Sequence, residues 1–470
     1  MLRPCSVAIL RNKSVRFRHL SLDKDKTCKS VTQRRGADYA EPAQTLARYG
    51  DETHMNPLKS VLLFCTASLT VAWPLRANVV TDWNGYASTA IVKNAGTPPA
   101  ASSVYFAYAA LAVYDAVNSI TGQYRPYCYY GTTAPTASLE SAAVAAAHRV
   151  LVNYFPTQQT DLDAKFAASL AALGVDPTMD PGVAAGEAAA AALIAIRTGD
   201  GAGANVSYTP GSGPGVWIPT PPAYAAAATP WLAKMRPFTM STAADFRPDG
   251  PTPLNSEGWK RDYDLTRLWG GQNSTIRSAS QSEIGLFWTE NTAQQYARAF
   301  TYLVNNYKLN VSDSARMMAI AWTAYADSGI ACWDGKFTYS FWRPVTAIPA
   351  GGGNADLQAD PAWMPLGVTP NHPEYPAAHG AITGSVTTAI AAFFGTTKVH
   401  VVMDSTAFTD GVHTHTYEDT RDWMDEVFWA RIYAGFHFYH SLQTARELGT
   451  AVAQQMLRTH FTPQRSGLIE

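Results

Sequence analysis

Apolar residues recur at spacings of three and four over most of residues 102–457, and alternating β-branched runs are nearly absent. This spacing places apolar side chains on one face of a helix, so it predicts helices rather than a sheet. The chain is therefore expected to be all-α. The predicted helices are Ser102–Ile120, Ser138–Tyr154, Gln158–Leu173, Gly182–Arg197, Ser280–Asn305, Ser312–Ala326, Ala377–Phe394 and Asp419–Leu457.

The composition supports a large folded core. The chain has 470 residues, of which 47% are hydrophobic and 11% aromatic, while the charged fraction of 16% is below the usual value of about 25%. This low charged fraction excludes a disordered chain, a coiled coil and a protein that binds nucleic acid by bulk charge, and the 36 Lys and Arg nearly balance the 37 Asp and Glu. Five cysteines are too few for a disulfide scaffold.

A segment rich in proline and glycine interrupts the helical pattern. Residues 201–256 contain GSGPG at 211–215 and IPTPP at 218–222. Such a long irregular stretch is the best candidate for a boundary. We expect it to connect an N-terminal helical lobe, residues 78–200, to a C-terminal helical lobe, residues 257–470, so that the fold is a two-lobed helical bundle.

The N-terminal 77 residues have the features of targeting sequence. Residues 1–54 carry 11 basic against 6 acidic residues without apolar periodicity. Residues 55–77 have a short basic start, an apolar run from Val61 to Leu75 and a small residue at the end, which is typical of a secretory signal peptide. We expect Met55 to be the true start and the protein to be secreted or periplasmic. The alternative is a basic disordered tail ahead of an internal apolar segment.

Removal of this region changes the charge and the cysteine count. Residues 78–470 hold 23 basic and 31 acidic residues, a net charge of −8. No uninterrupted apolar run of 18 residues follows residue 77, so no membrane span is expected. Cys128 and Cys332 remain, and the sequence leaves open whether they form a disulfide or two free thiols.

Three short segments of the second lobe carry candidate functional residues. The first runs from Trp333 to Pro344 and places Lys336 and Arg343 among aromatic residues. Pro344 favours an extended backbone at Arg343, so one continuous helix is not expected here. Cations in aromatic surroundings are costly unless an anion pairs with them. The alternative is that both side chains reach the surface with buried stems.

The second segment, His372 to Gly380, contains two prolines and then small residues that enter a helix. A rigid loop that leads into a helix N-terminus offers free backbone N–H groups to an anion. His379 would lie in the first helical turn, where a purely structural histidine is the alternative.

The third segment runs from Ala430 to Ser441. Arg431 and His437 would lie about 120° apart on an unbroken helix, but a break at Gly435 would let them converge. Alternatively, His437 and His440 would share a helical face as metal ligands. His413 and His415 would complete such a zinc site.

Taken together, the three segments resemble the active-site signature of the vanadium-dependent haloperoxidases. The signature reads Lys-x6-Arg-Pro, Pro-x-x-His and Arg-x5-His, in this order. This family belongs to the type-2 phosphatidic acid phosphatase superfamily, which includes bacterial acid phosphatases. Three further stretches are similar to exported bacterial haloperoxidases; they are residues 79–84, 114–117 and 214–217.

The resemblance implies an active site in the C-terminal bundle. Lys336, Arg343, Arg431 and the backbone N–H of Ala378 would bind orthovanadate as the cofactor. His437 would be the ligand bonded to vanadium, and His379 would be the acid–base residue. Trp333 and His372 would line the approach of the halide, and a histidine at position 372 is more similar to bromoperoxidases than to chloroperoxidases.

Three positions depart from the family pattern. Ala377 stands where a serine is usual, so a hydroxyl that would bond the oxyanion is missing, and Ala378 replaces a glycine. A lost hydrogen bond to a charged group is worth about 1.5–3 kcal/mol, so vanadate affinity would fall about tenfold to a hundredfold. Ser441 stands where the phosphatase pattern has an aspartate that orients the nucleophilic histidine, which argues against efficient phosphate ester hydrolysis.

These observations predict an enzyme that uses hydrogen peroxide to oxidise a halide, with bromide favoured. Its product would be hypohalous acid or a halogenated small organic acceptor. Vanadium would act as a Lewis acid. The alternatives are an exported acid phosphatase that works through a phosphohistidine, a non-catalytic binder of phosphate or vanadate, and a hydrolase that uses a divalent metal. No nucleic acid is expected as a partner, and the oligomeric state stays open.

Overall fold

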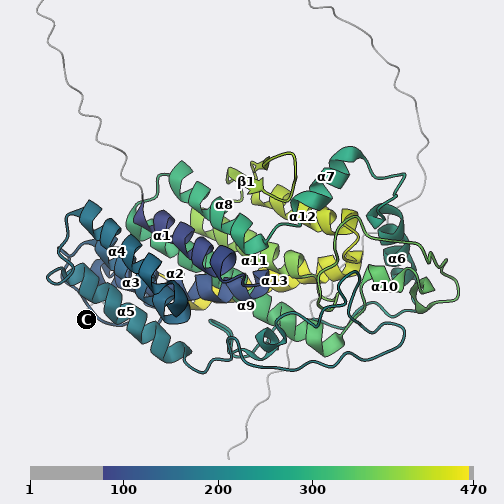
Figure 1. Ribbon diagram of the computed structural model, residues 1–470, viewed down its shortest axis with the longest axis horizontal. Coiled ribbons are helices and arrows are strands. Elements are labelled where there is room, and N and C mark those ends of the chain that lie inside the picture. The colour runs from purple at the N-terminus through teal and green to yellow at the C-terminus, as the bar shows by residue number, and fades with distance from the viewer. Residues whose placement is uncertain (1–77, 465–470) are drawn as a thin grey trace, which may run out of the picture. The chain divides into compact units, whose positions relative to one another are not determined.

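Thirteen α-helices and one β-hairpin make up residues 78–464, the part of the chain that the structure, a computed structural model, describes (Figure 1). The hairpin pairs β1, Val401–Ser405, with antiparallel β2, His413–Tyr417. A π-helical stretch spans Thr89–Asn94, and 3-10 turns span Pro156–Gln158, Pro230–Lys234 and Gly351–Gly353. The prediction of an all-α fold is confirmed. The α-helices are α1 Val79–Ser88, α2 Pro99–Thr121, α3 Leu139–Tyr154, α4 Gln159–Leu173, α5 Pro181–Arg197, α6 Glu257–Gly270, α7 Ala279–Phe287, α8 Thr292–Asn306, α9 Val311–Tyr339, α10 Pro344–Ala347, α11 Ala378–Phe394, α12 Thr420–Tyr433 and α13 Tyr439–Thr459.

Local sequence signals set several helix ends. The Ser138 side chain accepts a hydrogen bond from the backbone N–H of Ser141 and so caps α3. Gly174 ends α4 with a φ of 71°, a left-handed conformation that glycine adopts without strain. Both ends lie where the sequence predicts them.

Three helical segments differ from the sequence-based expectation. The helix expected over 280–305 is two helices, α7 and α8, because Asn291 caps α8 by accepting from the N–H groups of Ala293 and Gln294. The helix expected over 312–326 continues as α9 to Tyr339. The helical pattern over 419–457 is divided into α12 and α13.

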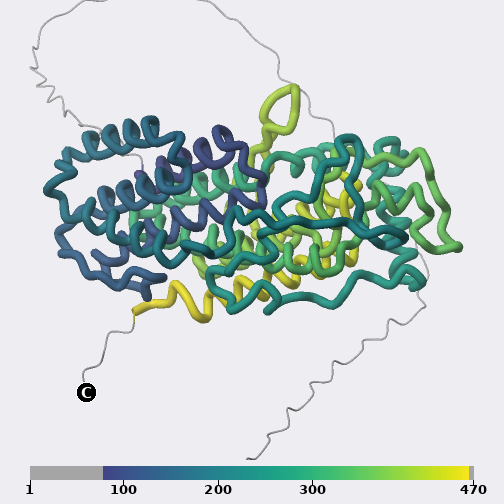
Figure 2. The backbone as a smooth tube through the Cα atoms, turned by 60° about the horizontal axis from the view of Figure 1, so that its bottom comes forward, coloured from purple at the N-terminus to yellow at the C-terminus, as the bar shows by residue number. Residues whose placement is uncertain are grey.

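Helix α2 lies in the core and packs against α3, α5 and α9, while α9 also packs against α11 and α13. In Figure 2 the early helices, purple to blue, gather toward one end, and green and yellow segments of later helices run among and beneath them. Among the described residues, α2 is the one helix long and apolar enough to cross a membrane, but 94% of its most apolar window is buried inside the fold. The division into lobes at residues 201–256 stays a prediction.

Glycines allow α11 and α13 to approach closely. A Cβ atom added at Gly449 would lie 1.8 Å from the carbonyl oxygen of Ala381, and one at Gly384 would lie 2.7 Å from the carbonyl oxygen of Arg446. Both contacts are with backbone, which cannot move aside without shifting a helix. The spacing of these two helices therefore depends on the absence of side chains at these positions.

The Gly449→Ala variant tests this contact. We expect its free energy of unfolding to fall by about 1–3 kcal/mol, because the added methyl group overpacks the helix interface. Gly329→Ala is the matched control, since Gly329 lies within helix α9 and a Cβ added there has no neighbouring atom within 4 Å. That control should gain about 0.5–1 kcal/mol. Urea unfolding followed by circular dichroism measures both, and equal midpoints for Gly449→Ala and the unchanged protein would contradict the interpretation.

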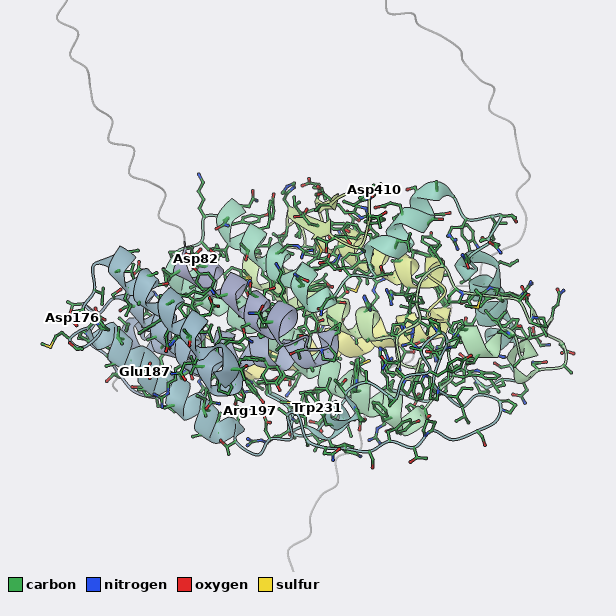
Figure 3. The ribbon with its side chains drawn as sticks, viewed as in Figure 1. Asp82, Asp176, Glu187, Arg197, Trp231 and Asp410 are labelled. Carbon is green, nitrogen blue, oxygen red and sulfur yellow. The ribbon has the colours of Figure 1, made fainter. Side chains whose placement is uncertain are left out.

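The β-hairpin was not predicted from the sequence, and it carries the two histidines considered as metal ligands. His415 Nδ1 lies 2.7 Å from Glu426 Oε1, and His413 Nδ1 lies 2.9 Å from Glu283 Oε1. His413 also contacts Asp410, which is labelled in the loop between the strands in Figure 3. Both histidines therefore pair with carboxylates, and all four side chains are partly buried.

The two cysteines of the described region do not form a disulfide. Cys332 is buried in α9, and its thiol contacts the carbonyl oxygen of Pro376 at 3.4 Å. Cys128 is partly buried. Residues 1–54 and the signal peptide expected at 55–77 lie outside the described residues.

Candidate active site

The structure brings the three predicted segments together. Lys336 lies near the end of α9, and Arg343 precedes α10 with an extended backbone, as predicted from the proline that follows it. His379 is the second residue of α11, as the helix entry predicted. Arg431 lies in the last turn of α12, and His437 lies in the connection from α12 to α13.

Breaks in the helices create this convergence. Ser340 adopts a φ of 47° and ends α9, which turns the chain so that Arg343 can reach back into the core. Gly435, with a φ of 76°, separates α12 from α13. The predicted break at Gly435 is therefore present, and Arg431 and His437 are not on one helix.

The ammonium group of Lys336 is fully buried and bound by main-chain carbonyls. Its Nζ donates to the carbonyl oxygen of Pro373 at 2.8 Å and to that of Glu374 at 3.0 Å. It also lies 5.7 Å from the centre of the Trp333 ring. Burial, together with nearby Arg343 and Arg431, lowers the pKa of Lys336 to about 7, although Cys332 and Glu374 oppose the shift. The alternative of a surface-reaching lysine is wrong.

Arg343 is also fully buried and uses its guanidinium to fix two histidines. Nε donates to the carbonyl oxygen of His372 at 2.9 Å, and Nη2 donates to Nδ1 of the same residue at 2.9 Å. Nη1 bonds the carbonyl oxygen of Phe436 at 2.9 Å and lies 3.1 Å from Nε2 of His437. Burial lowers the pKa of Arg343 to about 10, against the opposing charge of Glu374.

Arg431 has fewer partners than the other two cations. Its Nη1 donates to the carbonyl oxygen of Trp288 at 2.6 Å, and its guanidinium lies 4.7 Å from the centre of the Phe436 ring. Among the described residues, its buried Nε has no hydrogen-bond partner. Burial and the nearby Arg343 lower the pKa of Arg431 to about 9, and no carboxylate offsets them. A buried N–H without a partner is costly, so this one is suited to an added acceptor.

His379 is neutral and reaches the cavity from the start of α11. Burial, followed by the charges of Arg431, Arg343 and Lys336, lowers the pKa of His379 well below its usual value. Its Nε2 lies 3.1 Å from Oγ1 of Thr292. Ala377, the residue before the helix, offers no side-chain cap, so the first N–H groups of α11 lack that partner.

His437 forms a contact that the sequence did not predict. Its Nδ1 lies 2.8 Å from Oε1 of Glu374, and the same oxygen accepts from the N–H of Phe438 at 3.0 Å. Burial and three cations hold the pKa of His437 well below its usual value. Burial raises the pKa of Glu374 to about 7, although Arg343 and Lys336 lower it. The one feature of the sequence that could have indicated this partner of His437 is the presence of Glu374 within the second segment, His372 to Gly380.

A cavity of about 180 Å³ opens onto these groups. Trp333 and His372, predicted at the halide approach, both line it, and their ring centres are 4.9 Å apart. Other lining residues are His379, Arg431 and His437, with Ala378 at the start of α11. Lys336 and Arg343 are completely buried and held by the residue 372–374 loop beside it.

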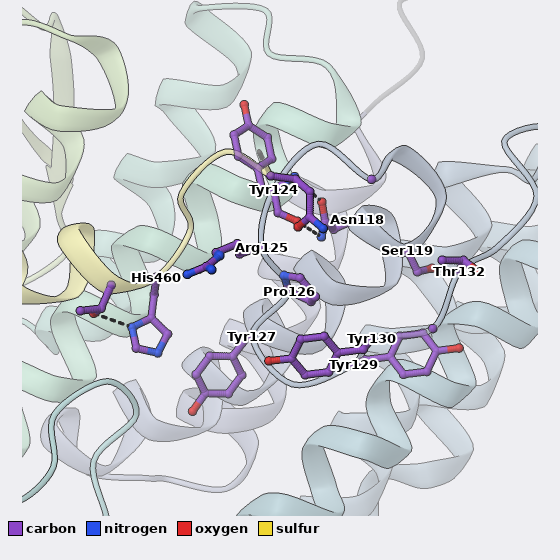
Figure 4. A pocket seen from close by; sticks show the side chains of 14 residues that line it. Asn118, Ser119, Tyr124, Arg125, Pro126, Tyr127, Tyr129, Tyr130, Thr132 and His460 are labelled. Atoms are coloured by element: carbon purple, nitrogen blue, oxygen red, sulfur yellow. Dashed lines mark hydrogen bonds between the residues drawn. The ribbon is translucent and has the colours of Figure 1, made fainter. Parts of the chain in front are cut away.

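A larger cavity of about 550 Å³ contains none of the predicted site residues (Figure 4). It is lined mainly by aromatic and polar side chains near the end of α2. These include Tyr124, Arg125, Tyr127, Tyr129, Tyr130 and His460.

The zinc-site alternative is wrong. Within residues 78–464, no group of three or more His, Cys, Asp or Glu side chains could hold a metal ion. His440 stacks on the Tyr375 ring, with centres 5.8 Å apart, instead of sharing a helical face with His437.

Comparisons with known proteins agree with this geometry. Residues 316–464 match the family described as the VCPO second helical-bundle domain. The vanadium chloroperoxidase of Curvularia inaequalis is 30% identical over an alignment 140 residues long, and the match covers 24% of this chain and 23% of that protein. The matched region thus spans about a quarter of the length of this curated relative.

Solved structures extend the likeness beyond this region. The crystal structure of a bacterial vanadium-dependent iodoperoxidase has a TM-score of 0.70 and 21% identity, and covers 83% of this chain and 98% of that one. The holo form of a bacterial vanadium-dependent chloroperoxidase has a TM-score of 0.63 and 17% identity, with coverages of 78% and 92%. The chain has the haloperoxidase fold.

The predicted resemblance to the vanadium-dependent haloperoxidases is therefore confirmed. The region that matches the haloperoxidase bundle, residues 316–464, contains the lysine, both arginines and both histidines of the site. The haloperoxidase-like fold also explains why residues separated by about 100 positions converge, since each comes from a different helix end.

The buried lysine predicts a pH dependence of anion binding. Because a pKa near 7 leaves Lys336 charged only below that pH, sulfate affinity should fall as pH rises through 7, by up to about tenfold per pH unit. Sulfate is the probe because its own charge is constant over this range. Isothermal titration calorimetry from pH 6 to pH 9 measures the effect. Lys336→Arg, which stays charged, should bind sulfate with less dependence on pH. If the unchanged protein bound sulfate equally tightly from pH 6 to pH 9, Lys336 would not be the group that titrates.

Proposed function

We propose that the protein is a vanadate-dependent haloperoxidase that uses hydrogen peroxide to oxidise a halide. The main support is one cavity lined by Arg431 and the two neutral histidines His379 and His437, with the buried cations Lys336 and Arg343 held beside it by the residue 372–374 loop. The product would be hypohalous acid or a halogenated organic compound.

The residues fit orthovanadate. Lys336, Arg343 and Arg431 supply positive charge. The buried Nε–H of Arg431 has no hydrogen-bond partner among the described residues, so it can donate to an oxyanion oxygen. The N–H of Ala378 at the start of α11 adds a backbone donor. His437 Nε2 would be the ligand. When bound, vanadate supplies a Lewis acid that activates peroxide without a redox change at the metal.

The protein's own groups would bind the cofactor, move a proton and shape the access path. His379 is neutral and lines the cavity, so its imidazole can accept a proton from incoming hydrogen peroxide. The three cations would stabilise negative charge that develops on oxygen. Trp333 and His372, which line the cavity, would form the approach of the halide.

We further propose bromide as the preferred halide, on the basis of the histidine at position 372. Burial, followed by the charges of Lys336 and Arg343, lowers the pKa of His372 well below its usual value, so it is neutral. Pro98, Pro99, Val368 and Phe436 give the cavity an apolar part that suits a small organic acceptor. The relatives are described as chloroperoxidases and an iodoperoxidase.

Export to the periplasm or the medium is proposed from residues 55–77, whose pattern is that of a signal peptide. A peroxide-using enzyme whose product is a reactive hypohalous acid would then act outside the cytoplasm. The oligomeric state stays open.

Bromination of monochlorodimedone tests the main proposal. We expect bleaching with peroxide and bromide after orthovanadate loading, and none before it. His437→Ala should reduce this activity by more than the 10- to 100-fold typical of changes at outer-shell partners, because it removes the ligand itself. His440→Ala is the matched control, since His440 contacts Tyr375 outside the cavity. Unchanged turnover in His437→Ala would overturn the site assignment.

An exported acid phosphatase is the second candidate, favoured by the Glu374–His437 contact of 2.8 Å. The sequence lacks the usual orienting aspartate at Ser441, but the structure supplies a carboxylate from another element. Cleavage of nitrophenyl phosphate without vanadate-dependent bromination would favour this function. Anion binding with neither activity would favour a non-catalytic phosphate or vanadate binder.

Ala377→Ser should restore the hydroxyl that the family pattern has at the start of α11. A hydroxyl can accept from the helix N–H groups and still donate to an oxyanion oxygen. We expect vanadate to bind about tenfold to a hundredfold more tightly, from a charged hydrogen bond of about 1.5–3 kcal/mol. Ala377→Gly is the control: it changes the same position without adding a hydrogen-bond donor, so it should not bind vanadate more tightly than the unchanged protein. Calorimetric titration with orthovanadate measures the change, and equal affinities for the serine and glycine variants would count against a cofactor contact at this position.

A further inference from the structure

Glu374 is a buried carboxylate at the centre of a site built to hold an anion. It is 0% exposed and lies between two prolines in the loop that enters α11. Its backbone carbonyl accepts from Lys336 Nζ at 3.0 Å, and its own N–H donates to the carbonyl oxygen of Phe341 at 2.8 Å. Both backbone groups are therefore fixed, which also fixes the direction of the side chain.

The side chain of Glu374 holds the ring of His437. Its Oε1 lies 2.8 Å from Nδ1 of His437 and accepts the N–H of Phe438 at 3.0 Å. On the other side of the imidazole, Nη1 of Arg343 lies 3.1 Å from Nε2. The ring is thus bound at both nitrogens by fully buried groups.

These two contacts select one tautomer of His437. A guanidinium has only donors, so Nε2 must be the acceptor and carries no proton. The proton of the neutral ring is therefore on Nδ1, where it is donated to the carboxylate. The Nε2 lone pair is the group that a vanadium or phosphorus centre requires, so the carboxylate keeps this nitrogen unprotonated.

We propose that Glu374 is a positioning residue, whose carboxylate holds His437 in the Nδ1–H tautomer with Nε2 directed at the oxyanion. This inference rests on the proposed role of His437 as the ligand or nucleophile. It assigns to Glu374 the work that the phosphatase pattern gives to an aspartate four residues after the histidine.

The position of Ser441 supports this replacement. Its hydroxyl is buried and, like Oε2 of Glu374, has no hydrogen-bond partner of good geometry among the described residues. The hydroxyl nevertheless lies close enough to the carboxylate of Glu374 to lower its pKa. An aspartate at position 441 would therefore bring a second carboxylate against Glu374, and the chain has serine there.

Separate titrations with vanadate and with sulfate test the proposal. Glu374→Ala should weaken vanadate binding by about 10- to 100-fold, because vanadate is bonded to His437 Nε2. Sulfate, which is held by the cations alone, should bind as tightly as before or more tightly, because a negative charge has left the site. If Glu374 had only a structural role, Glu374→Ala would lower the vanadate and sulfate affinities together. That result would overturn the proposal, and so would no change in either affinity.

Three further variants separate the proposed role from an effect on folding. Glu374→Gln keeps the shape and one acceptor oxygen, so it should weaken vanadate binding less than Glu374→Ala and in the same direction. Asp327→Asn changes an equally buried carboxylate, one bound to the N–H groups of Phe238 and Thr239, and should leave the ratio of vanadate to sulfate affinity unchanged. The double variant Glu374→Ala/Ser441→Asp should recover most of the lost vanadate affinity, since it returns a carboxylate to the histidine.

Nitrogen-15 NMR of histidine-labelled protein reads the tautomer directly, with His437 assigned by comparison with His437→Gln. The unchanged protein should show a protonated Nδ1 and an unprotonated Nε2, and Glu374→Ala should lose this preference. A protonated Nε2 in the unchanged protein would overturn the proposal. This measurement needs neither vanadate nor turnover, so absent bromination would reject the proposed function without deciding the role of Glu374.

Discussion

The site depends on three buried cations whose main protein partners are main-chain carbonyl groups. The carbonyls of His372, Pro373 and Glu374 accept from Lys336 and Arg343, and the carbonyl of Trp288 accepts from Arg431. Carbonyl groups orient a cation without neutralising it. Because burying unneutralised charge is costly, the folded protein retains a strong preference for an anion in the cavity. One carboxylate, Glu374, lies among them, and its oxygen is directed at a histidine instead of a cation.

The helix packing keeps these groups in place. Each charged or basic group comes from a different element, α9, α10, α11, α12 or the connection to α13, so no single element defines the site. The close contact of α11 with α13, which Gly384 and Gly449 permit, fixes the two histidine-bearing regions relative to each other. The haloperoxidase fold thus brings the ends of several helices together at the site. Chemistry is then decided by the side chains at those ends.

The sequence predicted the five charged and histidine side chains of the site because they are close to helix ends and have fixed spacings. It also predicted the extended Arg343 before Pro344 and the break at Gly435, since proline and glycine restrict or free the backbone in known ways. It could not predict that Trp288 would bind Arg431, because any residue has a carbonyl group. The break that exposes this carbonyl divides a helical pattern that reads as continuous over 280–305. The β-hairpin was missed because His413 and His415 alternate with threonine over only five residues.

The contact between Glu374 and His437 joins residues 63 positions apart, and it changes how the signature should be interpreted. From the sequence, Ser441 in place of the phosphatase aspartate argued against phosphate chemistry, because an orienting carboxylate was missing. In the folded chain the carboxylate is present but comes from the second motif. A histidine responds to the charge and acceptor beside its Nδ1, whichever element provides them. In this chain, the serine four places after the histidine therefore does not decide between the two functions, because Glu374 supplies the carboxylate. The discrimination has to come from the oxyanion contacts, and in this chain the alanine at position 377 is the contact that differs.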